Sequence, residues 1–161
     1  MVIKEYKNKT VLKGMDMNAL TQWCIDSGHP VFRAQQIYQW MYRHGANSAS
    51  DMSNISKKLQ KNLEEDCVLS TLRIEKIDAS ENEPTQKILF RTIDNQFIEA
   101  VSMLDGNRHT ICISSQIGCN VDCDFCATAS MGLIRNLLTG EIIDQAIAIR
   151  NLVKEPITNV V

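Results

Sequence analysis

The sequence predicts an α/β protein that opens with a small helical domain, continues as a run of strands and ends in the first part of a parallel βα repeat. Apolar residues recur every three or four positions up to about residue 66, which is the period of amphipathic helices. From Thr71 they recur at every second position, which is the period of half-buried strands. We therefore expect three parts: residues 1–66, 67–107 and 108–161.

Three helices are expected in the first part. Asp16 can cap one that ends at Gly28, and the apolar spacing predicts two more, over residues 32–44 and 51–66. Residues 1–50 hold six Lys and Arg against three Asp and Glu, although the whole chain has a net charge of −2. This local excess points weakly to nucleic acid, and a solvated helical face explains it equally well.

The second part is expected to be rich in strands, which lie at residues 72–74, 87–93, 96–104 and 108–114. In the third of these, Glu99 shares one side with Phe97, Val101 and Met103, so it lies on a mainly apolar face. A carboxylate in such surroundings can have a raised pKa that suits a general base. An exposed edge glutamate is the commoner arrangement.

A helix from Thr139 to about Lys154 should lead into a last strand at residues 157–161. A strand, a helix and a parallel strand make one βα unit, and we expect the repeat to continue beyond Val161. No segment resembles a signal peptide or a membrane-spanning helix, which predicts a cytoplasmic protein. The residues of the helix expected to face inward are Ile142, Ile143, Ala146 and Ile147.

The cysteines carry the strongest chemical signal, because four of the six fall between residues 112 and 126, which favours metal over a disulfide framework. Cys119, Cys123 and Cys126 are separated by three and then two residues. Three thiolates leave one iron of a 4Fe–4S cluster open to an outside ligand such as S-adenosylmethionine. Structural zinc with Cys112 as fourth ligand is the alternative, although such sites usually use two separate cysteine pairs. The other two cysteines are interpreted as core or surface residues: Cys24 and Cys67.

Four stretches extend the pattern beyond the cysteine triad, Cys119, Cys123 and Cys126. They are FRAQQIYQWMY at residues 32–42, FIEAV at 97–101, CISSQIGCNVDCDFCAT at 112–128 and RNLLTGEI at 135–142. Together they resemble the RlmN/Cfr family of radical S-adenosylmethionine RNA methyltransferases, and the RlmN branch more than the Cfr branch. The resemblance implies a partial (βα) radical-SAM barrel, one 4Fe–4S cluster, S-adenosylmethionine, and an electron donor such as flavodoxin or ferredoxin. It implies methylation of adenine C2 in ribosomal RNA and tRNA.

Two alternatives stay open beside this activity: methylation at C8, as in the Cfr branch, and a remnant that binds metal or RNA without catalysis. In the family, a cysteine near the C-terminus carries the methyl group. That cysteine, the segment that holds S-adenosylmethionine and the other barrel units would lie beyond Val161. We therefore expect that this chain does not complete the reaction alone.

The resemblance also implies roles for single residues. Glu99 matches the family's proton acceptor, and Cys112 matches the cysteine that resolves the RNA adduct through a transient disulfide. Phe125 matches an aromatic residue that packs near the adenosyl group. Without the resemblance, a buried strand cysteine and a loop anchor are equally ordinary interpretations of Cys112 and Phe125. The first domain resembles an accessory domain that helps to hold RNA, so its candidate phosphate contacts are Arg33, Arg43, Lys57, Lys58 and Lys61.

The chain departs from the family pattern at two places. One is Ala129, Ser130 and Met131 after the triad, and the other is Met103 with Leu104. These changes affect loop shape and leave the three cysteines intact.

Overall fold

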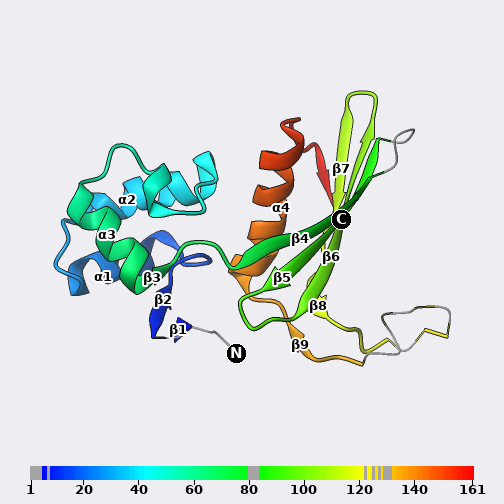
Figure 1. Ribbon diagram of the computed structural model, residues 1–161, viewed down its shortest axis with the longest axis horizontal. Helices are drawn as coiled ribbons and strands as arrows, with labels where there is room; N and C mark the ends of the chain where they lie inside the picture. The colour runs from blue at the N-terminus through cyan, green and yellow to red at the C-terminus, as the bar shows by residue number, and fades with distance from the viewer. Residues whose placement is uncertain are drawn as a thin grey trace. The chain divides into compact units, whose positions relative to one another are not determined.

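The computed structural model of the chain describes residues 5–6, 8–79, 84–121, 123–124, 126, 128 and 132–161. The chain forms two compact units, Met1–Thr71 and Leu72–Val161 (Figure 1). Within the described ranges, every helix is too short or too polar to cross a membrane.

Helices make up most of the first unit. The Asp16 side chain caps α1 (Met17–Asp26) by accepting a hydrogen bond from the Ala19 amide at 2.8 Å. The next helix, α2 (Phe32–Tyr38), runs directly into a π-helical turn, η1 (Gln39–His44). A 3₁₀ turn, η2 (Ala49–Asp51), precedes α3 (Lys57–Asp66). The apolar faces of these elements share one core, which includes Leu20, Ile37, Met41, Leu59 and Leu63.

Two features of this unit differ from the prediction. The third helix begins only at Lys57, because Ser56 is extended and caps it by accepting a hydrogen bond from the Leu59 amide at 3.3 Å. The unit also contains a small sheet that was not expected. Strands of two or three residues show no period, so the sequence gives no signal for them. They are β1 (Glu5–Tyr6), β2 (Lys9–Val11) and β3 (Cys67–Val68), in the order β1-β2-β3.

The second unit is built on a five-stranded sheet in the order β10-β7-β6-β5-β4 (Figure 1). An antiparallel meander contains β4 (Leu72–Ala79), β5 (Thr85–Thr92), β6 (Phe97–Asp105) and β7 (Arg108–Cys112). The last strand, β10 (Asn159–Val160), lies parallel to β7, which confirms the expected return after a helix. The sheet takes strands from residues 67–107 and from residues 108–161, and the division of the chain into three domains stays a prediction.

One helix, α4 (Thr139–Val153), packs on one face of this sheet (Figure 1). Of its four expected inward residues, Ile147 is buried, Ile142 and Ala146 are partly buried and pack against the core of the sheet, and Ile143 is partly exposed. Polar side chains of α4 are buried as well, because they hold neighbouring segments: Gln145 accepts a hydrogen bond from the Ser114 amide at 2.8 Å and donates to the Ser114 carbonyl at 2.9 Å. The buried residues of α4 are Gly140, Glu141, Asp144, Gln145, Ile147 and Ile149.

Candidate metal centre

The segment that carries the three cysteines is a loop closed by two short strands. These are β8 (Gln116–Ile117) and β9 (Arg135–Asn136), which pair antiparallel with Ile117 opposite Arg135. Next to this pair, the Ile134 amide donates to the Ile117 carbonyl at 2.9 Å, and the Cys119 amide donates to the Gly132 carbonyl at 3.2 Å. The backbone therefore fixes Cys119 at the base of the loop.

The close approach of the two loop ends requires glycine at position 118. Gly118 has a φ of +74°, in the left-handed region. A Cβ at this position would lie 1.8 Å from the Gly132 carbonyl oxygen, which is a backbone atom with no freedom to swing aside. The base of the loop is therefore as tight as a glycine allows.

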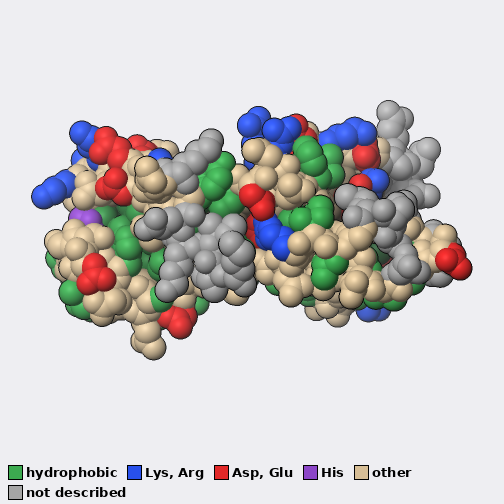
Figure 2. All heavy atoms as spheres, turned by 90° about the horizontal axis from the view of Figure 1, so that it is seen from below, with side chains coloured by type: hydrophobic (Ala, Val, Ile, Leu, Met, Phe, Trp, Pro, Cys, Tyr) green, Lys and Arg blue, Asp and Glu red, His purple; other side chains and the backbone are tan. Residues whose placement is uncertain are grey.

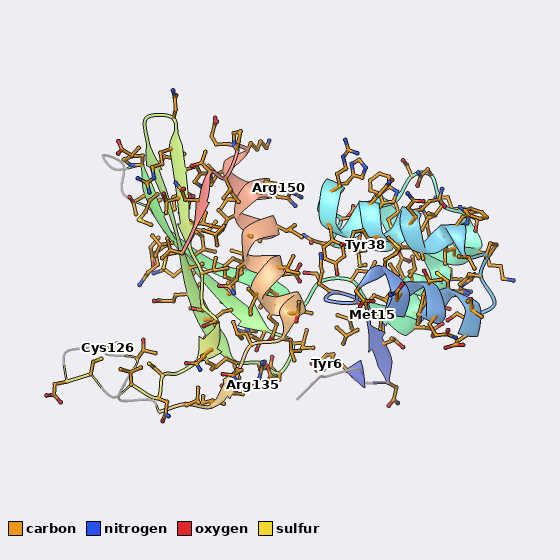
Figure 3. All side chains as sticks on the ribbon, turned by 180° about the vertical axis from the view of Figure 1, so that it is seen from behind. Tyr6, Met15, Tyr38, Cys126, Arg135 and Arg150 are labelled. Atoms are coloured by element: carbon orange, nitrogen blue, oxygen red, sulfur yellow. The ribbon has the colours of Figure 1, made fainter. Side chains whose placement is uncertain are left out.

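All three predicted ligands lie on this loop, half-buried, and none of the six cysteines forms a disulfide. The Val121 amide points at Cys119 Sγ with an N–S distance of 3.4 Å, and the Cys126 amide donates to the Cys123 carbonyl at 3.0 Å. Figure 3 shows Cys126 on the part of the loop that extends beyond the sheet. Among the described residues, no three His, Cys, Asp or Glu side chains are close enough together to hold a metal ion.

The donor set nevertheless fits an iron–sulfur cluster with one open iron. It consists of three thiols on one short segment, and an amide directed at a sulfur is the kind of contact that tunes such clusters. Metal sites commonly form only when the metal gathers its ligands, so the three thiols would draw together on binding. Phe125 lies outside the described residues, as do Ala129, Ser130 and Met131.

Glu99 and Cys112 share the face of the sheet opposite the buried one. On β6, Ile98, Ala100 and Ser102 are buried, so Glu99 and Val101 point to the other side. Cys112, exposed at the end of β7, pairs directly with Val101 and therefore points the same way. The expected alternation on β6 is present, but the face that carries Glu99 is the more exposed one.

Glu99 forms an ion pair on this face. Its carboxylate lies 3.1 Å from the ammonium of Lys87 on β5, and about half of each side chain is exposed. The hydrogen bond and the charge of Glu99 raise the pKa of Lys87, so Lys87 stays protonated beside it. The Ser114 hydroxyl donates to the backbone carbonyl of Glu99 at 2.7 Å.

Sequence reasoning missed a charged network beside the loop. Arg135 forms two hydrogen bonds to Asp94, both at 2.9 Å, and two to Glu141, both at 2.7 Å. Hydrogen bonds to Glu141 are the main cause of a raised Arg135 pKa. Burial alone would raise the pKa of Asp94, but the hydrogen bonds from Arg135 and Thr92 outweigh it and the pKa is lowered. The RNLLTGEI stretch placed Arg135 and Glu141 six residues apart, and that spacing was the available signal.

Two of the candidate RNA contacts come together in the first unit. Burial lowers the pKa of His29, and the positive charges of Lys58 and Arg33 lower it further, so α2 and α3 bring these cations near one imidazole. The Arg33 guanidinium lies 4.8 Å from the centre of the exposed Phe32 ring. Figure 2 shows basic and acidic side chains intermixed on the visible face of this unit.

The other three candidates do not join this group through any contact among the described residues. Lys61 pairs with Glu65 at 3.7 Å, and Arg43 and Lys57 are exposed.

We predict that alkylation separates the cysteines into two classes. Burial raises the pKa of Cys24 and raises that of Cys67 to about 12. At neutral pH, Cys67 should hold roughly 10³-fold less thiolate than an ordinary cysteine, so iodoacetamide should leave both residues unmodified in the native protein. Peptide mass spectrometry should find rapid modification of the exposed Cys112. Equal modification of all six before denaturation would contradict this assignment.

The chain is similar to known RNA methyltransferases along most of its length. A family profile described as the N-terminal domain of ribosomal RNA large subunit methyltransferase matches residues 10–69. The dual-specificity RNA methyltransferase RlmN of Geobacter sulfurreducens is 39% identical over 150 residues, which make up 93% of this chain and 41% of that protein. The protein of the same name from Pelobacter propionicus is 42% identical over 142 residues, 88% of this chain and 41% of that protein.

The similarity extends to a solved structure, in fold and in sequence. The crystal structure of a radical SAM methyltransferase from Sphaerobacter thermophilus superimposes with a TM-score of 0.86 and 36% sequence identity, over 93% of this chain and 45% of that chain. The chain therefore spans less than half the length of the relatives that it matches.

Proposed function

We propose that this chain is part of an RlmN-type protein, and that the whole protein methylates RNA by radical S-adenosylmethionine chemistry, at C2 of an adenine. The named relatives are RNA methyltransferases, and this chain corresponds to about two fifths of their length. The proposal extends to ribosomal RNA and tRNA as substrates, to a flavodoxin or ferredoxin as electron donor and to the cytoplasm as location.

The observation that carries the proposal is the closed loop with Cys119, Cys123 and Cys126. These thiols would hold a 4Fe–4S cluster, and Phe125 would pack near the adenosyl group of S-adenosylmethionine. When bound, the cluster would supply the electron that breaks a sulfonium C–S bond and yields a carbon radical. Adenine C2 is not a nucleophile, so a radical route supplies the reactivity that direct methyl transfer lacks.

Glu99 and Cys112 would handle the later steps on the open face of the sheet. Glu99 would accept the proton that leaves C2, and Lys87, 3.1 Å away, would orient its carboxylate. The Cys112 thiolate would attack the sulfur of the methyl-carrying cysteine: a transient disulfide would form, the sulfur–carbon bond to the RNA would break, and its electron pair would stay with the carbon on the RNA. Their shared orientation supports this division of work, because both side chains can meet one substrate.

The first unit would contact the phosphate backbone of the RNA. The pair Arg33 and Lys58 near His29, with Phe32 exposed beside them, supports this role because phosphate and base contacts commonly combine cations with an aromatic ring. The further candidates in this unit are Arg43, Lys57 and Lys61.

Nucleoside analysis of treated RNA tests the proposal. The whole protein, reconstituted without oxygen and supplied with a reductant and S-adenosylmethionine, should convert adenosine in ribosomal RNA to 2-methyladenosine. The matched control is the Cys126→Ala variant, which should leave the RNA unmodified. Finding 8-methyladenosine would show that the methylated position is C8 and would refute the proposal of C2. Finding no methylated base, while S-adenosylmethionine is cleaved normally, would refute RNA methylation.

A further inference from the structure

Arg135 uses its whole guanidinium group at the base of the cysteine loop. Nε and Nη2 donate to the two oxygens of Asp94, and Nη1 and Nη2 donate to the two oxygens of Glu141. Nη1 donates a further hydrogen bond to the Asn136 carbonyl at 3.1 Å. A guanidinium has five N–H donors, and these five contacts occupy all of them. Arg135 therefore has no donor left for an RNA phosphate.

The two carboxylates come from separate segments that this arginine joins. Asp94 lies in the turn between β5 and β6, and Glu141 lies in the first turn of α4. The Glu141 side chain is fully buried and also accepts a hydrogen bond from the Leu138 amide at 2.8 Å, which caps the helix. A buried carboxylate needs a partner, so Arg135 is held firmly where it is.

This anchor lies close to the first predicted ligand along the chain. Arg135 stands opposite Ile117 in the β8–β9 pair, and Cys119 follows Ile117 by two residues, after the Gly118 contact. On the other side of the loop, Gln145 holds Ser114 through both of its backbone groups. Glu141 and Gln145 lie one turn apart on α4, so this helix fixes the chain on both sides of the loop.

We propose that Arg135 is a positioning residue for the cluster: by joining Asp94 and Glu141, it sets the place at which Cys119 meets the iron. The inference rests on the proposed cluster. Lysine cannot replace Arg135, because its three donors cannot hold two bidentate carboxylates. Contacts that orient a metal ligand are worth about 10- to 100-fold in metal affinity, and Arg135 would orient Cys119 through the β8–β9 pairing.

The test compares the full chain with Arg135→Lys and Glu141→Gln. Each apoprotein is reconstituted anaerobically with ferrous iron and sulfide, and the cluster is then titrated with an iron chelator. Arg91→Lys is the matched control, since Arg91 pairs with Glu75 at 2.8 Å across β5 and β4 of the same sheet, and neither residue belongs to the cysteine loop. We expect Arg135→Lys to hold the cluster about 10- to 100-fold more weakly, with an altered EPR signal, and Arg91→Lys to match the wild type.

Hydrogen exchange separates positioning from folding. In the Arg135→Lys apoprotein, the amides of Cys119 and Ile134 should exchange faster while those of α4 stay protected. If that variant does not fold, Glu141→Gln tests the inference in its place, because glutamine still caps α4 but forms a weaker, uncharged hydrogen bond with Arg135. If the folded Arg135→Lys variant bound the cluster as tightly as the wild type, the inference would be wrong but the proposed function would stand. A cluster that survives Cys119→Ala would instead overturn the proposed function.

Discussion

Replacing Gly118 by alanine is expected to open the base of the cysteine loop. The left-handed backbone alone costs an alanine about 1–2 kcal/mol. In addition, the new Cβ would lie 1.8 Å from the Gly132 carbonyl oxygen, so the backbone at one end of the loop must move. The total loss in unfolding free energy should be about 2–4 kcal/mol, which corresponds to a fall of roughly 10 °C or more in the melting temperature of this unit. Thermal unfolding of the apoprotein measures it.

The matched control is Gly106→Ala. Gly106 also has a positive φ, +54°, but a Cβ there would meet nothing within 4 Å. It should therefore lose only the backbone part of the free energy. Cluster uptake should fall in Gly118→Ala and stay normal in Gly106→Ala. Equal effects of the two substitutions on melting and on cluster uptake would show that the contact with Gly132 is unimportant.

Replacing Glu99 by glutamine is expected to abolish most of the methyl transfer while the cluster remains. Glutamine has nearly the same shape but cannot accept the proton, and a positioned base contributes about 10²–10⁴-fold to a rate. Single-turnover transfer of the methyl group to RNA by the whole protein measures this step. Iron content and cleavage of S-adenosylmethionine should stay at wild-type levels, because Glu99 lies on the sheet and outside the cysteine loop.

The control for this variant is Glu75→Gln. Glu75 lies on β4 of the same sheet and has an arginine partner, as Glu99 has a lysine partner. If removing a carboxylate from the sheet only disturbed an ion pair, both variants would lose little activity, since exposed pairs contribute about 0–1 kcal/mol. A rate within a few-fold of wild type for Glu99→Gln would refute its role as base.

The sequence predicted those elements whose residues repeat a clear period. The period of two located the starts and ends of β5 and β6 to within two residues, and Asp16 marked the start of α1. The small sheet of the first unit and the late start of α3 were not predicted, because two-residue strands and a helix cap produce no repeating pattern of apolar residues. The small sheet depends on pairing between β2 and the distant β3, and a local sequence pattern does not identify such a partner.

The same distinction applies to the candidate site. Cysteine spacing pointed to Cys119, Cys123 and Cys126, which the structure places on one loop, and those assignments stay predictions. Arg135 was missed as a site residue, because one of its two carboxylate partners, Asp94, lies 41 residues earlier in the chain. The buried polar side of α4 was missed for the same reason. Gln145 is buried because it hydrogen-bonds to the backbone of Ser114, and a pattern of apolar residues does not predict such a bond.

The most direct test of the account is iron and sulfide uptake by the chain and its single cysteine variants. Wild type and Cys112→Ala should take up equal amounts of iron and sulfide and, once reduced, give a cubane EPR signal that S-adenosylmethionine changes. Cys119→Ala, Cys123→Ala and Cys126→Ala should each lose that signal. The account would be contradicted if the wild type took up no iron and held zinc tightly, and if the Cys112→Ala variant lost that zinc. Such a result would indicate a closed site with four protein ligands.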